Sequence, residues 1–194
     1  MANRVIVFVH GYMGSPRQFE ALIQKLRGQD TVDMVDICRV VLPGHEATVD
    51  QFVSSKASDW QSAVDNALNT LRMQYDEIVL VGHSMGGLLL INSTAKCADN
   101  IYVVFTIALP LHIKLTVKGV AIRIRSATQS TYSKYAKTAK EMRGVSGITF
   151  MNLYRLLPNT LALLKIMNQA RNILPTLAIP LIVINSSGDE IVSM

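Results

Sequence analysis

Short apolar runs alternate with amphipathic helical patterns along most of this chain. Five runs rich in Val, Ile and Leu predict strands, at residues 5–9, within 34–42, and at 78–81, 101–109 and 180–185. Continuous apolar runs of this length are typical of parallel strands buried on both faces. Apolar residues also recur at helical spacing at 19–26 and at 60–71. Alternating strands and helices predict an α/β fold with a doubly wound, mostly parallel sheet of about five strands.

The first predicted helix carries recognisable start and stop signals. Ser15 is expected to cap it, with Pro16 at the first helical position and Gln18 closing a capping box. Phe19, Leu22, Ile23 and Leu26 would form its apolar face, and Gly28 would end it. The second helical pattern places Trp60, Val64, Leu68 and Leu71 on one face.

Residues 111–175 break the strand–helix rhythm. The stretch 130–143 is polar and basic, whereas 151–172 is apolar with a helical period interrupted at Pro158. We therefore expect a mostly helical cap insertion at about 111–175, above a core formed by residues 1–110 and 176–194. The whole chain, 1–194, is expected to be a single domain.

The strongest chemical signal is the pattern G-x-S-x-G at residues 82–86. It lies between the apolar run 78–81 and a segment of helical character at 87–91. A strand–turn–helix context of this kind predicts a nucleophile elbow, in which a strained turn lifts Ser84 Oγ clear of the sheet. The first N–H groups of the following helix can then stabilise negative charge beside it. The plainer alternative is that Gly82 and Gly86 are ordinary turn glycines and Ser84 an ordinary helix cap.

Three polar residues follow predicted strands. His10 comes after 5–9, Ser84 follows closely on 78–81, and Asp189 lies in the loop after 180–185. Functional sites of parallel sheets gather at the carboxyl ends of the strands, so these residues are expected at the same edge.

Composition narrows the class of protein. The chain is 49% hydrophobic and 17% charged, as expected for a folded globular domain. No apolar run approaches the roughly 18 residues of a membrane span, and the N-terminal run is too short for a signal peptide. Cys38 and Cys97 form neither a disulfide framework nor a metal-ligand cluster. We expect a cytoplasmic protein with no metal and no cofactor.

The net charge of +5 is unevenly distributed. Residues 112–172 contain eleven Lys and Arg against one acidic residue, Glu141. A solvated basic surface is one interpretation, and attraction to anionic ligands or peripheral membrane contact through the basic cap is another. We do not expect nucleic-acid binding, because no recognition motif accompanies the charge.

Four motifs resemble those of a known group of enzymes. They are His-Gly-Tyr-Met-Gly-Ser-Pro at 10–16, Leu-Pro-Gly-His at 42–45, Gly-His-Ser-Met-Gly-Gly at 82–87 and Gly-Asp-Glu-Ile-Val at 188–192. In this order and spacing they resemble the α/β-hydrolase superfamily, and more narrowly its monoacylglycerol lipase and carboxylesterase group of serine esterases. The resemblance covers nearly the whole chain and implies an α/β-hydrolase fold with a helical cap.

The resemblance also implies roles for individual residues. Ser84 would be the nucleophile, the backbone N–H groups of Tyr12 and Met85 would form the oxyanion hole, and Asp189 would orient the catalytic histidine. Glu190 is the nearest substitute for Asp189, which could instead be a turn residue. The implied reaction is hydrolysis of a small-molecule carboxylic ester, with lipid-like esters among the candidates, through an acyl-serine intermediate.

The chain departs from the family pattern at the histidine. The family places that residue in a loop after one further strand, whereas this sequence stops five residues after Asp189. His10, His45 and His83 are expected to be structural, with His83 pointing away from Ser84 Oγ. His112 is the one histidine that we consider as a substitute for the catalytic base.

Two expectations follow from that departure. We expect a C-terminally shortened chain whose run 181–184 is a bare apolar edge strand, unless a partner chain covers it. We also expect ester hydrolysis to be incomplete without the histidine, since serine needs a base to take its proton. A non-catalytic binding protein of the same fold, and an acyltransferase or thioesterase using the same site, remain alternatives.

Overall fold

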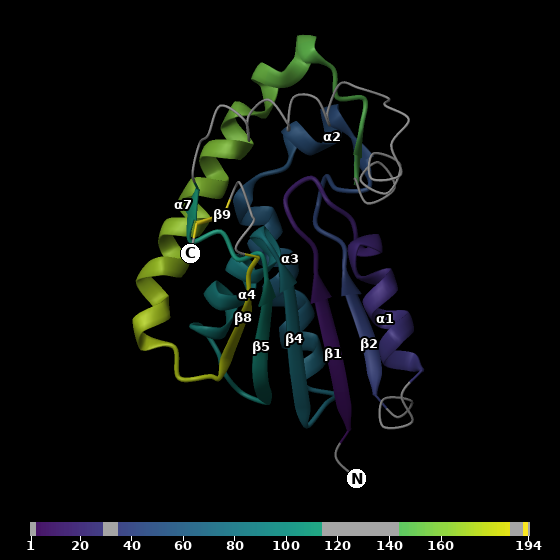
Figure 1. The fold of residues 1–194 in the computed structure, drawn as a ribbon, viewed down its shortest axis with the longest axis vertical. Coiled ribbons are helices and arrows are strands. Elements are labelled where there is room, and N and C mark those ends of the chain that lie inside the picture. The colour runs from purple at the N-terminus through teal and green to yellow at the C-terminus, as the bar shows by residue number, and fades with distance from the viewer. Residues whose placement is uncertain (1–2, 29–34, 114–143, 187–191, 194) are drawn as a thin grey trace.

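The fold is an α/β sandwich around a parallel sheet, seen in a computed structural model that describes residues 3–28, 35–113, 144–186 and 192–193. Five strands pair in the order β2-β1-β4-β5-β8, all parallel. Their bounds are β1 Arg4–Val9, β2 Asp36–Val40, β4 Glu77–His83, β5 Ile101–Ile107 and β8 Leu181–Ile184. Figure 1 shows β4 in the middle, with β1 and β2 on one side and β5 and β8 on the other. The predicted sheet of five parallel strands is confirmed.

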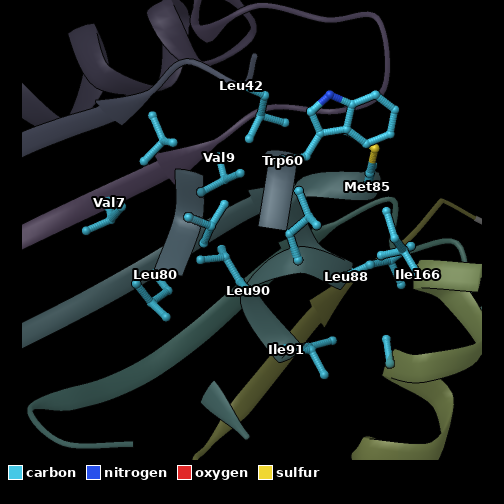
Figure 2. Close-up of a cluster of buried hydrophobic side chains, with 14 of the residues drawn as sticks. Val7, Val9, Leu42, Trp60, Leu80, Met85, Leu88, Leu90, Ile91 and Ile166 are labelled. Atoms are coloured by element: carbon cyan, nitrogen blue, oxygen red, sulfur yellow. The ribbon is translucent and has the colours of Figure 1, made fainter. Parts of the chain in front are cut away.

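Helices cover both faces of the sheet. Helix α1 (Glu20–Arg27) and the short 3-10 turn η1 (Pro16–Phe19) pack Phe19 and Ile23 against Phe8 and Val81. The other face carries α3 (Ala57–Arg72), α4 (Met85–Thr94) and α7 (Leu157–Ile173) around a larger core (Figure 2). The four apolar residues predicted on one face of α3 are all buried. Of the face predicted for α1, however, Leu22 is exposed.

The predicted capping box at Ser15 and Gln18 is wrong. The Ser15 side chain makes no capping hydrogen bond, and Gln18 Oε1 instead accepts from the N–H of Gly11 at 3.1 Å. The loop 10–14 lies over this first turn, so the N–H of Gly11, seven residues before Gln18, takes the acceptor that a local cap would have used.

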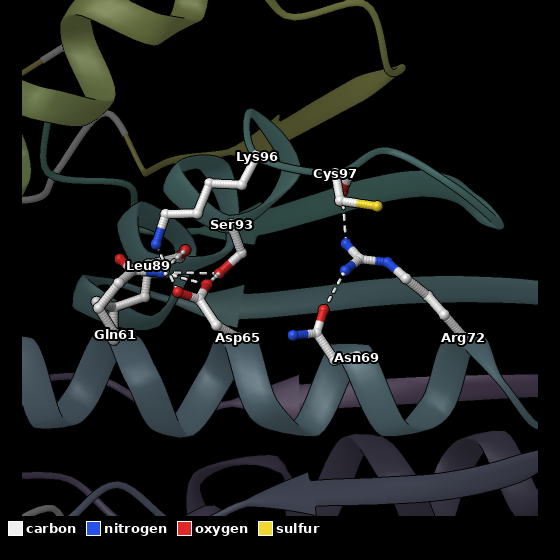
Figure 3. A network of polar contacts seen from close by, with 8 residues as sticks. All are labelled: Gln61, Asp65, Asn69, Arg72, Leu89, Ser93, Lys96 and Cys97. Carbon is white, nitrogen blue, oxygen red and sulfur yellow. Dashed lines mark hydrogen bonds and ion pairs between the residues drawn. The ribbon is translucent and has the colours of Figure 1, made fainter.

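Helix α4 is buried on every side. All ten of its residues are buried, between the sheet and helices α3 and α7. A polar network ties it to α3, where Asp65 accepts hydrogen bonds from Gln61 and Ser93 and pairs with Lys96 (Figure 3). Burial by itself would raise the pKa of Asp65, but these hydrogen bonds outweigh it and hold the pKa below its usual value.

Shorter elements lie above the carboxyl end of the sheet and beside it. Strand β3 (Ala47–Thr48) pairs with β7 (Val145–Ser146), and β6 (His112–Ile113) pairs with β9 (Val192–Ser193). The described residues also form α2 (Val49–Ser54), η2 (Phe150–Leu156) and η3 (Leu174–Thr176). Helix α7 begins at Leu157 with Pro158 in its first turn, where the missing N–H costs nothing. Of the expected cap, 114–143 lie outside the described residues.

Candidate active site

Ser84 occupies a sharp turn between β4 and α4. Its backbone angles, φ 52° and ψ −118°, are rarely adopted by a residue with a side chain, and such a conformation costs of order 1–3 kcal/mol. The turn is held by the N–H of Ser84, which donates to the carbonyl of Ile107 on β5 at 2.9 Å. The predicted strand–turn–helix arrangement is therefore present, with the serine at its apex.

The turn requires a small residue at position 86. A Cβ atom placed on Gly86 would lie 2.0 Å from the carbonyl oxygen of Val9, at the end of β1. The start of α4 thus presses directly on the neighbouring strand. The second glycine of the motif exists because two backbones meet there.

A glycine-rich loop, residues 10–14, lies against the serine. A Cβ atom on Gly11 would lie 3.2 Å from Ser84 Cβ and 2.8 Å from His83 Nδ1. The loop follows β1, which pairs with β4 so that Val9 is opposite Gly82. The two segments that carry the predicted oxyanion donors, Tyr12 and Met85, are therefore brought to the same end of the sheet.

Met85 is the first residue of α4, where backbone N–H groups have no partner within the helix. Among the described residues, none accepts a hydrogen bond from its N–H. Aligned peptide dipoles make this end of a helix favourable for negative charge. The geometry around Met85 is thus that of an anion-stabilising helix start.

The peptide between Gly11 and Tyr12 is held through its carbonyl oxygen. Its carbonyl, that of Gly11, lies 3.0 Å from His10 Nδ1 and accepts from the N–H of Gly14 at 3.0 Å. In a planar trans peptide the N–H points opposite to the carbonyl. The Tyr12 N–H is therefore directed away from His10.

His10 and His45 are buried supports rather than titrating groups. Nε2 of His10 accepts from the N–H of Leu42, and Nε2 of His45 accepts from that of Met13, so Nδ1 of each ring carries the proton. Burial lowers the pKa of His10 to about 4, against a smaller opposing effect of its bond to Gly11. Burial likewise lowers the pKa of His45 to about 4, opposed by backbone hydrogen bonds. Both rings are neutral near pH 7.

The Tyr12 side chain packs into an aromatic cluster. Its ring makes edge contacts with Phe52 and Trp60, at centroid distances of 5.2 and 6.1 Å. Its hydroxyl lies 3.3 Å from the hydroxyl of Thr160 on α7. Position 12 thus links the loop beside Ser84 to both α3 and α7.

The remaining predicted residues are two histidines and two acidic residues. His83 packs over Gly11. His112 is exposed on β6, and its Nδ1 accepts from Arg171 at 3.3 Å. Asp189 and Glu190 lie outside the described residues, so their relation to Ser84 stays a prediction.

Sequence reasoning missed three supports of the loop. The sequence predicts Gln18 in a helix cap and Trp60 on the apolar face of a helix, and it gives Gly144 no role. Trp60 Nε1 donates to the carbonyl of Pro43 at 3.0 Å. The N–H of Gly144 donates to the carbonyl of Met13 at 2.9 Å. No local pattern signals such contacts, because each joins segments distant in the sequence.

The described residues contain neither a metal-binding cluster nor a membrane-spanning helix. In the parts of the chain that the structure describes, no three His, Cys, Asp or Glu side chains gather as a metal site would need. Within the same parts, no helix has the length and apolar character needed to cross a membrane.

Comparisons with known proteins give a family. The family model described as "Alpha/beta hydrolase family" matches residues 6–182. No curated protein matches significantly. Among solved structures, one from work on two metagenome-derived lipolytic enzymes is 20% identical at a TM-score of 0.71, covering 100% of this chain and 76% of that one.

Two further structures agree in fold. One, from work on carboxylesterases of the thaumarchaeon Nitrososphaera gargenis, is 16% identical at a TM-score of 0.68 and covers 97% of this chain and 74% of its own. The monoacylglycerol lipase of Paleococcus ferrophilus is 16% identical at a TM-score of 0.60, and the match covers 95% of this chain and 75% of that one. With the family model spanning most of its length, this chain belongs to the α/β-hydrolase family.

Proposed function

We propose that this protein is a serine hydrolase that cleaves carboxylic esters through an acyl-serine intermediate. One observation carries the proposal: Ser84 stands at a strained strand-to-helix turn with the loop 10–14 packed against it. That arrangement supports a site in which the hydroxyl lies near two sets of backbone N–H donors, as acyl transfer requires. Ser84 is the proposed nucleophile, and the N–H groups of Tyr12 and Met85 are the proposed oxyanion donors.

The proposed reaction has two stages. Ser84 Oγ attacks the ester carbonyl, a base takes its proton, and the oxyanion accepts hydrogen bonds from Tyr12 and Met85. Collapse of this intermediate releases the alcohol with that proton and leaves an acyl-serine, which water then hydrolyses to the acid. Asp189 is proposed to orient the base. Within this chain His112 is the histidine to test as that base.

The substrate is proposed to be a small carboxylic ester, including lipid-like ones. The structures of similar fold include proteins named as a lipolytic enzyme, carboxylesterases and a monoacylglycerol lipase, which supports this choice. Residues 111–175 are proposed to act as a cap on the body formed by 1–110 and 176–194. The unpaired Cys38 and Cys97 support a cytoplasmic location.

Peripheral membrane contact through the cap is proposed as well. Its described part carries a row of exposed apolar side chains on η2 and α7: Met151, Tyr154, Leu157, Leu161 and Leu164. Between 142 and 188 the sequence has no acidic residue, while Arg155, Lys165 and Arg171 are cationic. Exposed apolar and basic side chains together suit an anionic lipid surface.

The proposal is tested by covalent labelling with a fluorophosphonate, which transfers its phosphonyl group to an activated serine with loss of fluoride. We expect slow labelling and slow p-nitrophenyl ester hydrolysis in the wild type and neither in Ser84→Ala. Both should proceed at the wild-type rate in Ser93→Ala, which changes a buried serine further along α4. Labelling of Ser84→Ala at the wild-type rate would exclude Ser84 as nucleophile. A wild type that neither labels nor hydrolyses esters would contradict the proposed activity for this chain.

A further inference from the structure

Met13 holds an unusual backbone conformation for its side chain. It is the third residue of a tight turn, 11–14, closed by the N–H of Gly14 donating to the carbonyl of Gly11 at 3.0 Å. Its φ is 57°, as in turns whose third residue is normally Gly or Asn. Without outside contacts, a methionine there would favour the common turn with negative φ, in which the central peptide is rotated. Something must therefore hold the Tyr12–Met13 peptide.

Two contacts hold Met13, one on each side of the residue. Its N–H donates to His45 Nε2 at 3.1 Å, and its carbonyl accepts from the N–H of Gly144 at 2.9 Å. The first contact specifies the direction of the Tyr12–Met13 peptide, because the N–H must face an acceptor. The second fixes the following peptide.

His45 is itself rigidly placed. Its Nδ1 lies 3.2 Å from the Pro43 carbonyl, to which Trp60 Nε1 also donates. Its ring contacts Phe52 and Trp60 edge-on, at 5.0 and 5.6 Å between centroids. Because Nδ1 donates to the carbonyl, Nε2 is left as the acceptor that Met13 needs.

Gly144 is placed where only glycine fits. A Cβ atom on it would lie 1.9 Å from the carbonyl oxygen of Gly14. Its own carbonyl accepts from the N–H of Ala47 at 2.9 Å, next to the pairing of β3 with β7. The chain thus passes between the loop 10–14 and the segment that follows His45, bonded to both.

We infer that His45 and Gly144 are positioning residues for the loop that faces Ser84. By holding Met13 at positive φ, they keep the turn 11–14 in the form seen here, with Tyr12, the proposed oxyanion donor, next to Gly11, which lies against Ser84. Neither residue touches the reacting atoms. The inference rests on the proposed function for its catalytic consequence, but the holding of Met13 can be measured without any catalysis.

The first experiment measures hydrogen exchange of the Met13 amide in protein labelled with [15N]methionine, with Met13→Leu assigning its signal. In His45→Leu, which keeps bulk but removes the acceptor, we expect exchange at least ~10-fold faster relative to the other methionine amides. In His45→Gln, whose Oε1 can replace Nε2, we expect it within about threefold of the wild type. Val64→Ala, a core truncation in α3, controls for general destabilisation. Equal exchange in His45→Leu and the wild type would overturn the inference.

Gly144 is tested by the same readout. Gly144→Ala should accelerate Met13 exchange, whereas Gly28→Ala should not, because a Cβ on Gly28 has no neighbour closer than 3.8 Å. Unchanged Met13 exchange in Gly144→Ala would remove Gly144 from the inference.

The second experiment measures fluorophosphonate labelling of Ser84 in the same variants. We expect about tenfold slower labelling in His45→Leu and near-wild-type labelling in His45→Gln. Equal labelling in the two variants would overturn the catalytic part of the inference even if Met13 exchange differs. A wild type that does not label would count against the proposed function, and the exchange data would still decide whether His45 and Gly144 hold Met13.

Discussion

Two residues with side chains hold positive φ at the candidate site, and neighbours impose the conformation on both. Ser84 is pinned to β5 and to the end of β1 through Gly86, and Met13 is pinned to His45 and Gly144. Strain of this kind persists only where the surrounding structure outweighs it. Single substitutions next to these residues should therefore have effects out of proportion to their size.

Gly86→Ala is expected to lower the free energy of unfolding by about 2–4 kcal/mol. The added methyl group would overlap the Val9 carbonyl, so the start of α4 or the end of β1 must move. Urea unfolding measures the loss. Gly28→Ala serves as the control and should change the free energy of unfolding by less than about 0.5 kcal/mol. An equal effect of the two substitutions would contradict the packing argument.

Stability is expected to fall as the pH is lowered from 7 to 4. The pKa values of His10 and His45 are about 4 in the folded protein, below the ordinary value of about 6.5. The unfolded chain therefore takes up protons first, and each histidine costs about 3 kcal/mol over this range. Urea unfolding across the range should show roughly half this slope in His45→Gln. A slope in that variant equal to the wild type would show that His45 is not held neutral.

At the scale of elements, packing rather than helix propensity decides where the helices lie. Helix α4 contains glycine, serine and threonine, which favour helices weakly, yet it is buried on all sides. Helix α7 has two unlike faces. One, including Leu163, Ile166 and Ala170, packs against the body, and the other exposes Leu157, Leu161 and Leu164.

The two faces of α7 should respond differently to truncation. Ile166→Ala is expected to cost about 2–4 kcal/mol, because it opens a cavity beside α4. Leu161→Ala, at a half-exposed position, should cost less than about 1 kcal/mol. Denaturant midpoints compare them, and equal costs would mean that the buried face does not hold α7 in place.

The exposed face of α7 is the part of the cap to test for membrane contact. We expect the chain to co-sediment with vesicles containing anionic phosphatidylglycerol, more weakly with phosphatidylcholine alone, and more weakly at high salt. The double substitution of Leu157 and Leu161 by Ser should lower this binding at least about tenfold, because two leucine side chains that would enter the lipid are lost. Unchanged binding would place the contact elsewhere or exclude it.

At the scale of the molecule, the described sheet ends in an apolar strand. Strand β8 pairs on one side with β5, and within the described residues no strand pairs with its other side. Ile182, Val183 and Ile184 are 45–53% exposed. Open strand edges with apolar side chains pair with other chains unless charge or cover prevents it.

Val183→Lys is therefore expected to reduce self-association of the chain. Light scattering over a range of protein concentrations should show a concentration-dependent increase in mass for the wild type and less for the variant. Lys25→Arg, on the exposed side of α1, is the matched surface control. Equal association in the wild type and Val183→Lys would mean that the edge of β8 is not the contact.

The sequence alone determined the strand–helix order, the five parallel strands and the turn that carries Ser84. These features are local: a buried strand, an amphipathic helix and a G-x-S-x-G turn each leave a pattern within about ten to fifteen consecutive residues. The pairing of residues remote in the chain leaves no such pattern. The sequence therefore gives no partner to His45. It also predicts a helix cap at Gln18, although the side chain accepts from Gly11, only seven residues away.

Only the tertiary structure decided how the loop beside Ser84 is supported. His45, Gln18 and Gly144 reach it from other segments, and His10, its first residue, contacts it from within. The bonds from His45, Gln18 and Gly144 each satisfy a backbone group of the loop, so the fold as a whole selects them. Short sequence patterns therefore predict which residues make up the candidate site, while the geometry of the site depends on contacts that form only when the chain folds.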